Sequence, residues 1–229
     1  MLAEVDATLT ATLVLVCKRP LLGHGKQRLA ARIGERKALQ IAEHLLGCAL
    51  EDLHSWNGPR VIAPDSSEHF GWASALVPHA QCVPQPCGNL GERLNTLDQV
   101  LRGAGHRRLV FIGSDAPALR LEDYQRACTA LREADTVLIA ASDGGVVLMA
   151  SNRPWPDLAG LPWSTDELGQ ALAAACRQAG HSVSICGESF DIDEPRDLNR
   201  ALVELADDQR PARLRLRQVM ARLCQEAPV

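Results

Sequence analysis

The residue with the clearest chemical signal in this sequence is Asp115, which follows a short apolar run at residues 109–112 and precedes Pro117. Such a run is typical of a strand buried on both faces of a parallel sheet. Ligands of open α/β sheets bind beyond the carboxyl ends of the strands, so Asp115 could hold a divalent cation, which prefers oxygen ligands and can bridge phosphates. The simpler alternative is that Asp115 caps the helix that follows Pro117.

A basic loop follows a second apolar run, residues 12–17, and leads into a helix predicted at residues 30–53. A strand, a loop with glycine, lysine and arginine, and a helix together offer backbone amides and cations to a phosphate. The residues of this loop that could contact phosphate are Arg19, Gly23, Lys26 and Arg28. The loop matches neither the Walker pattern nor G-x-G-x-x-G, so a solvated basic loop is the alternative.

A second glycine-rich loop, residues 86–93, opens a helix predicted at residues 94–103. Gly88 lies in this loop, and Arg93 stands in or beside the first helical turn. The helix dipole disfavours a cation at that end, which suggests that Arg93 binds a ligand rather than stabilising the helix.

The sequence Asp143-Gly144-Gly145 lies between apolar runs at residues 135–141 and 146–150. One interpretation is a hairpin turn between two strands. The other is that the glycines let a ligand approach the backbone closely, with Asp143 in contact with it.

Trp163 and Ser164 precede a helix predicted at residues 167–180. Ser164 or Thr165 is expected to be the N-cap of this helix, with Glu167 in a position like that of a capping box. Capping accounts for the two hydroxyl residues, and Trp163 at the edge of the loop is left free to contact a substrate.

Two aspartates, Asp191 and Asp193, precede a helix that ends near residue 206. Asp193 is a reasonable N-cap for this helix, because Pro195 is tolerated in a first helical turn. That interpretation does not account for Asp191.

These segments alternate between strands and helices, which predicts an α/β fold. Strands are predicted at residues 12–17, 59–64, 82–85, 109–112, 135–141, 146–150 and 182–186. Residues 1–206 are expected to form a single domain, and residues 207–229 a C-terminal helical extension after a polar linker at 207–211. Arginines from Arg213 to Arg222 stud this last helix, so it is predicted to be a solvated face rather than a packing element for a partner subunit.

The composition excludes several function classes. A formal net charge of −4 argues against a general nucleic-acid binder, and an aromatic content of 3% argues against base-stacking platforms. Residues 1–10 carry no signal-peptide pattern, and no apolar run has the length of a membrane span. The eight cysteines form no C-x-x-C pair, so we expect mostly buried thiols, such as Cys48, Cys128 and Cys176, in a cytoplasmic protein.

Six motifs, in this order, resemble those of a bacterial family of radical-SAM/selenodomain-associated transferases with the GT-A fold, over roughly residues 12–203. In this chain they read KRP and GHGKQRL at residues 18–20 and 23–29, GNLGER at 88–93, GSDAP at 113–117, DGGV at 143–146, WST at 163–165 and DIDEPRDL at 191–198. The residues that depart from the family pattern are Gln27, Asn89, Ala116 and Val146, which replace Thr, Asp, Cys and Tyr.

The resemblance implies a three-layer α/β/α sandwich with a mostly parallel central sheet, of the GT-A or nucleotide-diphospho-sugar transferase-like type. It implies nucleotide and phosphate binding by Arg19, Gly23, Lys26, Arg28, Gly88 and Arg93. It implies Mg²⁺ or Mn²⁺ binding by Asp115 and Asp193, with catalytic roles for Asp115 and for Asp143 as acceptor ligand or base. Substrate contacts are expected from Gly144, Gly145, Trp163 and Ser164.

The implied reaction is metal-dependent transfer of a glycosyl or related group from a nucleotide-sugar to a small-molecule acceptor. Metal, lysine and arginine would stabilise charge on phosphate oxygens by position rather than by covalent catalysis. One alternative is nucleotidyl transfer from an NTP to a small phosphorylated acceptor with release of pyrophosphate. A second is a non-catalytic nucleotide-binding or scaffold protein. No nucleic-acid or membrane partner is expected, and a homodimer could form through the C-terminal helix.

Overall fold

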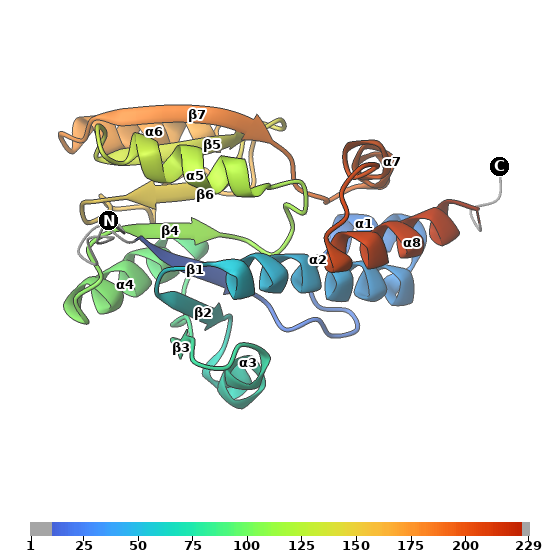
Figure 1. Ribbon diagram of the computed structural model, residues 1–229. Coiled ribbons are helices and arrows are strands. Elements are labelled where there is room, and N and C mark those ends of the chain that lie inside the picture. Colours follow the sequence, from blue (N-terminus) through green and yellow to red (C-terminus); the bar gives the residue numbers. More distant parts are fainter. Residues whose placement is uncertain (1–10, 226–229) are drawn as a thin grey trace, which may run out of the picture.

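A computed structural model describes residues 11–225 of the chain (Figure 1). The segment 1–10, on which the expectation about a signal peptide rests, lies outside the described residues. The described strands form one seven-stranded sheet in the order β3-β2-β1-β4-β6-β5-β7. They are β1 (Thr12–Cys17), β2 (Arg60–Pro64), β3 (Gln81–Cys82), β4 (Leu109–Ile112), β5 (Thr136–Ala141), β6 (Val146–Ser151) and β7 (Val183–Ser189).

Strand β6 runs antiparallel to its neighbours β4 and β5, and the other described strands run parallel to one another. The predicted α/β fold with a mostly parallel central sheet is therefore confirmed. The antiparallel β6 follows β5 directly because residues 142–145 form a tight connection, whereas parallel neighbours need a longer crossover.

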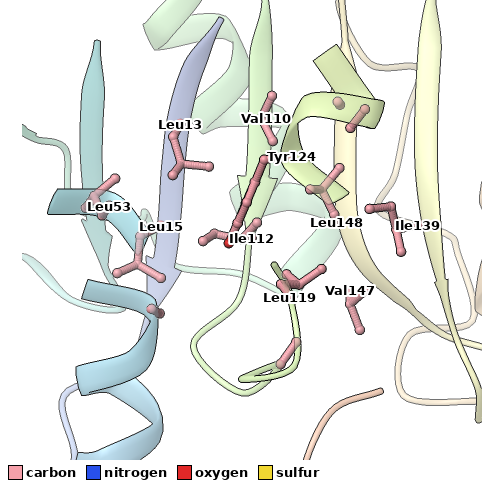
Figure 2. Packing of buried hydrophobic residues seen from close by; sticks show 14 of the residues in the cluster. Leu13, Leu15, Leu53, Val110, Ile112, Leu119, Tyr124, Ile139, Val147 and Leu148 are labelled. Carbon is pink, nitrogen blue, oxygen red and sulfur yellow. The ribbon is translucent and has the colours of Figure 1, made fainter. Parts of the chain in front are cut away.

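Helices cover both faces of the sheet, because successive side chains of a strand point to opposite faces. Leu13 and Leu15 of β1 pack in the cluster that holds helices α2, α3 and α5, and Figure 2 shows the buried side chains of this face. Val14 packs on the other face, with α4 and α6. The helices are α1 (Gln27–Ile33), α2 (Glu35–Ser55), α3 (Phe70–Leu76), α4 (Leu90–Gly103), α5 (Leu121–Ala130), α6 (Leu168–Gln178), α7 (Pro195–Glu204) and α8 (Pro211–Gln225), with a 3₁₀ turn η2 at Ser67–His69.

The prediction of a single helix at residues 30–53 is wrong, because the chain forms two helices there, α1 and α2, which meet at Gly34. Gly34 has φ 88° and ψ 151°, a conformation that is open almost only to glycine. The apolar periodicity continues across this break, so periodicity alone could not reveal it.

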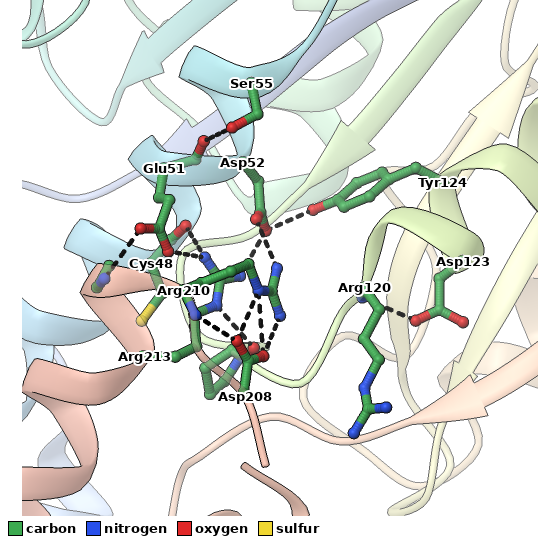
Figure 3. Close-up of polar contacts among 12 residues, drawn as sticks. Cys48, Glu51, Asp52, Ser55, Arg120, Asp123, Tyr124, Asp208, Arg210 and Arg213 are labelled. Atoms are coloured by element: carbon green, nitrogen blue, oxygen red, sulfur yellow. Dashed lines mark hydrogen bonds and ion pairs between the residues drawn. The ribbon is translucent and has the colours of Figure 1, made fainter.

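The prediction that the arginines of the C-terminal helix form a solvated face is wrong for the side of the helix that faces α2. Helix α8 packs against α2, and Arg213 is fully buried there. Its guanidinium pairs with Glu51 at 3.0 Å and with Asp52 at 2.6 Å (Figure 3). Arg215 and Arg222 lie on the exposed side, as expected. Arginines of one helix therefore lie in different surroundings, buried at Arg213 and exposed at Arg215 and Arg222.

The predicted linker at 207–211 is packed as well. Arg210 pairs with Asp208 at 2.6 Å and reaches Asp52 at 3.0 Å, in the same cluster as Arg213 (Figure 3). A segment that is polar in sequence is thus held by ion pairs against α2.

Across residues 11–225, no helix combines the length and the apolar character that crossing a lipid bilayer requires. The cysteines whose side chains the structure describes are free thiols: Cys17, Cys48, Cys82, Cys87, Cys128, Cys176 and Cys186. Cys48 and Cys176 are buried as predicted, whereas Cys128 is half-buried and Cys87 is exposed.

Candidate active site

A cleft of about 600 Å³ opens at the edge of the sheet where β1 and β4 end and β6 begins. This is the edge at which ligands of open α/β sheets bind. The predicted site residues that line it are Arg19, Lys26, Arg28, Arg93, Asp115, Asp143, Gly145, Trp163, Ser164 and Asp193. The predicted site residues Gly23, Gly88 and Gly144 do not line it.

Lys26 joins the basic loop to the two predicted metal ligands. Its Nζ donates to Asp115 Oδ2 at 3.0 Å and to Asp193 Oδ1 at 2.7 Å. Gly25, at φ 81°, and Lys26 itself, at φ 47°, turn the chain so that the lysine side chain enters the cleft before α1 begins. The Lys26 side chain is 12% exposed, and the two carboxylates are 38% and 40% exposed.

Asp191 completes this cluster, although sequence reasoning did not assign it a role. One carboxylate oxygen from each of Asp115, Asp191 and Asp193 lies within 4.8 Å of the others. Asp191 and Asp193 flank the fully buried Ile192, as alternate residues of an extended segment do. The backbone amide of Ile192 donates to the Asp115 carbonyl oxygen at 3.0 Å and holds the two acidic segments together. The D-x-D spacing was the signal that could have identified Asp191.

The electrostatics of the cluster are those of excess negative charge. Burial, followed by the charges of Asp115, Asp193 and Asp143, raises the pKa of Asp191 to about 7. For Asp115, burial acts to raise the pKa, but the neighbouring Lys26 ammonium outweighs it and the pKa is lowered. The three carboxylates therefore attract a cation, and Lys26 supplies one positive charge.

The capping alternatives for both aspartates are wrong. Helix α5 begins only at Leu121, so Asp115 does not cap it. The N-cap of helix α7 is Glu194, and Asp197 is its capping-box partner in the first turn. Asp197 Oδ2 accepts hydrogen bonds from the amides of Asp193 at 3.0 Å and Glu194 at 2.7 Å. Because Asp197 serves the helix, the carboxylate of Asp193 is left to face Lys26.

The connection 142–145 between β5 and β6 is the predicted hairpin turn, and it also faces the cleft. Asp143 Oδ1 accepts from the Gly145 amide at 3.0 Å, and both residues line the cleft. Gly144 has a packing role instead, since a Cβ there would lie 1.9 Å from the carbonyl oxygen of Asp166. The close approach expected of a ligand at Gly144 is thus made by the protein itself.

The glycine-rich loop 86–93 is arranged around a capping box. Helix α4 begins at Leu90 rather than at residue 94, with Asn89 as its N-cap and Glu92 as the reciprocal partner. Gly88 has φ 124°, and a Cβ on it would lie 2.4 Å from Glu92 Oε2, so its role is local. Arg93 is half-buried in the first turn and lines the cleft.

Trp163 and Ser164 form part of the cleft wall, but the predicted N-cap is wrong. Helix α6 begins at Leu168, and Ser164 adopts φ 66°. Thr165 Oγ1 accepts from the Glu167 amide at 3.3 Å, which makes a turn before the helix. Trp163 Nε1 donates to the Leu158 carbonyl oxygen at 2.8 Å, so the indole is held in place.

The basic loop is anchored to the end of β2 by Asp65. This carboxylate contacts His24 Nε2 at 3.0 Å and His69 Nδ1 at 2.9 Å. The guanidinium carbon of Arg19 lies 5.8 Å from the centroid of the Trp72 ring, over its face. Arg28 is exposed and lines the cleft. The loop therefore presents its cations from a fixed backbone.

Gln85 also lines the cleft and was not predicted to belong to the site. It is 5% exposed, and its Nε2 donates to the Ala63 carbonyl oxygen at 2.7 Å. Its buried Oε1 has no partner among the described residues. Buried polar atoms are normally satisfied, so this acceptor indicates that a water or a ligand group completes the cleft.

This combination of sheet, covering helices and cleft is the nucleotide-diphospho-sugar transferase-like fold. The chain belongs to the DUF2064 family, described as an uncharacterized protein conserved in bacteria, whose model matches residues 50–165. That range includes Asp115 and Asp143 but neither Lys26 nor Asp193. No curated protein matches the chain.

Among solved structures, the chain is similar to a candidate nucleotide-diphospho-sugar transferase from Desulfovibrio desulfuricans G20. The two are 25% identical, with a TM-score of 0.82, and the match covers 94% of this chain and 98% of the other. A 4-diphosphocytidyl-2C-methyl-D-erythritol synthase is 14% identical, with a TM-score of 0.55 and coverage of 86% and 98%. A cytidylyltransferase from Leptospira borgpetersenii is 10% identical, with a TM-score of 0.55 and coverage of 96% and 99%. The last two show a shared fold.

Proposed function

We propose that this protein is a metal-dependent transferase that takes a glycosyl or related group from a nucleotide-sugar and gives it to a small-molecule acceptor. The observation that carries the proposal is that a phosphate-binding type of loop and three carboxylates meet in one cleft, through the contacts of Lys26 with Asp115 and Asp193. The similarity to the Desulfovibrio candidate transferase supports it.

The residues present fit a divalent cation. Mg²⁺ and Mn²⁺ favour oxygen ligands, and Asp115, Asp191 and Asp193 offer carboxylate oxygens within 4.8 Å of one another. A buried ammonium already compensates two of them, which supports a cation site at this position. When bound, the ion would stabilise negative charge on phosphate oxygens.

The chain's own residues would divide the remaining work by position. Lys26, Arg19, Arg28 and Arg93 surround the cleft and would bind and orient the phosphates of the donor. Asp143 would bind the acceptor or take a proton from it, because its carboxylate faces the same cleft. Trp163 and Ser164 would form the wall against the acceptor.

The second candidate is nucleotidyl transfer from an NTP to a small phosphorylated acceptor. The contact between Lys26 and Asp193 favours it, because it joins the basic loop to the D-x-D-x-P motif, the pair of motifs typical of that branch of the fold. The two reactions differ in their products, since the first releases an NDP and the second releases pyrophosphate. A non-catalytic binding protein would release neither.

The test is a thermal-stability screen of the wild-type chain against NTPs and nucleotide-sugars, with and without Mn²⁺. A ligand at about 100 times its Kd stabilises the folded state by about 2.7 kcal/mol, which is a rise of about 5–10 °C in Tm for a chain of this length. Asp115→Ala should abolish a metal-dependent shift, whereas Asp207→Ala, at an exposed aspartate before α8, should retain it. Product analysis of the donor identified in this way then separates the two reactions. Absence of any shift would contradict a nucleotide-utilising enzyme.

Several sequence-based expectations stay predictions beside this proposal. They are the radical-SAM/selenodomain association, the cytoplasmic location, the homodimer through α8, and the separation of residues 207–229 as an extension. Because the inner side of α8 is buried against α2, a homodimer would have to use its exposed side, where Arg215 and Arg222 lie.

A further inference from the structure

Lys26 occupies the place between two of the carboxylates that would hold the metal ion. Its Nζ lies 2.7 Å from Asp193 Oδ1 and 3.0 Å from Asp115 Oδ2. A bound divalent cation lies about 2.0–2.6 Å from its oxygen ligands. An ammonium and a metal ion cannot share the same two oxygens at these distances, because they would overlap and repel each other.

Lys26 is held in place by its surroundings. The side chain is largely buried, and its backbone carbonyl accepts the Ala30 amide at 2.8 Å in the first turn of α1. Both of its contacts join an ammonium to a carboxylate, and such charge-assisted hydrogen bonds are among the strong ones. A metal ion that uses these two oxygens must therefore displace a paired ammonium.

A second partner for Lys26 can come from the donor. Lys18, Arg19, Arg28 and Arg93 line the same cleft, so a phosphate group would enter surroundings that are already basic. A lysine side chain is a flexible stem with a point charge and can turn from carboxylates to phosphate oxygens. The unpartnered, buried Oε1 of Gln85 is an independent sign that a ligand completes this cleft.

We propose that Lys26 holds the place of the metal ion in the free protein and leaves Asp115 and Asp193 when the phosphates of the donor bind. This inference rests on the proposed function and deepens it, because it makes metal and donor bind cooperatively at one site. The cation alone binds weakly, since it competes with the ammonium. The donor removes the competitor, and by linkage the cation raises the affinity for the donor by the same factor, commonly about 5–150-fold.

The first experiment uses Mn²⁺ alone and follows free Mn²⁺ by electron paramagnetic resonance in a titration of wild type, Lys26→Met, Lys18→Met and Asp115→Ala. Lys26→Met should bind Mn²⁺ at least about 5-fold more tightly than wild type, because the carboxylates lose their competitor. Lys18→Met is the matched control, since it removes an equal charge from the same cleft without freeing the carboxylates. The affinity of Lys18→Met for Mn²⁺ should differ less from that of wild type than the affinity of Lys26→Met does. Lys26→Gln replaces Lys26→Met where the methionine variant does not fold.

The second experiment measures binding of inorganic pyrophosphate by calorimetry, with and without Mg²⁺, after subtraction of the complex that forms in solution. Mg²⁺ should raise the affinity of wild type for pyrophosphate by about 5-fold or more. In Lys26→Met this factor should fall towards one.

The outcomes separate the two proposals. If Asp115→Ala loses Mn²⁺ binding but Lys26→Met binds no more tightly than wild type, the exchange is wrong and the metal site stands. If Mn²⁺ binding is absent from both wild type and Lys26→Met, or is insensitive to Asp115→Ala, both the exchange and the metal-dependent function are wrong.

Discussion

The guanidinium Nε of Arg213 donates a hydrogen bond to the carbonyl oxygen of Pro117 at 3.1 Å. Helix α8 is thereby tied to the loop that carries Asp115, two residues before Pro117. The same guanidinium pairs with Glu51 and Asp52 of α2 (Figure 3). The C-terminal helix is thus part of the framework behind the candidate active site.

Arg213→Met should destabilise the protein strongly. Breaking a buried ion pair costs about 3–5 kcal/mol, and Asp52 would keep only Arg210 and the Tyr124 hydroxyl as partners. Urea denaturation measures the change. The double variant Arg213→Met/Asp52→Asn should lose less than the sum of the two single variants, because the residues are in contact. Arg222→Met, on the exposed side of α8, should change the free energy of unfolding by no more than about 0.5 kcal/mol. Equal effects at Arg213 and Arg222 would contradict the burial of Arg213.

Two glycines near and within α2 should respond in opposite directions to alanine. Gly34→Ala should lower the free energy of unfolding by about 1–3 kcal/mol, because φ 88° with ψ 151° is strained for a residue with a Cβ. Gly47→Ala should raise it by about 0.5–1 kcal/mol, since alanine favours the helix interior. A Cβ meets nothing within 4 Å at either position, so backbone conformation alone separates the two variants. Stabilisation by Gly34→Ala would restore the prediction of one continuous helix.

Two measurements should distinguish metal binding by Asp193 from helix stabilisation by Asp197. Asp197→Ala removes the capping-box carboxylate from the first turn of α7 and should cost about 0.5–2 kcal/mol of stability, with little effect on Mn²⁺ binding. Asp193→Asn should instead weaken Mn²⁺ binding by at least about tenfold, since even residues behind the metal ligands contribute 10–100-fold. Urea denaturation and the Mn²⁺ titration give the two readouts. The reverse pattern would return Asp193 to a capping role.

Asp65 should make the stability of the protein depend on pH. Burial acts to raise its pKa, but hydrogen bonds from His24 and His69 outweigh it and the pKa is lowered. A carboxyl with a lowered pKa stabilises the folded state above its unfolded value of about 4, and this contribution is lost as pH falls through the lower native value. Wild type should therefore be more stable than Asp65→Asn at pH 6, and the difference should shrink below about pH 4. A difference that is constant over this range would mean that the carboxylate charge has no part in it.

The strands were predictable because their signal is local. Continuous apolar runs such as residues 12–17 and 109–112 became β1 and β4 at those bounds. The loops after them were correctly expected to reach one edge of the sheet, because parallel strands bring their carboxyl ends together. Most of the predicted site residues consequently line one cleft.

Capping was less predictable, because several residues near a helix start can each supply an oxygen. Asp193 was the predicted N-cap of α7, but the N-cap is Glu194, with Asp197 as its capping-box partner. Ser164 and Thr165 looked like caps for α6, but the close packing of Gly144 against residue 166 sets a different path for the chain there.

By itself, the sequence determined the order of strands and helices and the types of residue that reach the edge of the sheet, because these follow from apolar periodicity and from strand ends. Only the tertiary structure decided which charges meet. Lys26 pairs with Asp115 and Asp193, which lie 89 and 167 residues further along the chain. Arg213 pairs with Asp52 of α2, which lies 161 residues earlier. Contacts of this separation depend on how the layers pack, and an arginine or aspartate looks the same in sequence whether it will face water or an opposite charge.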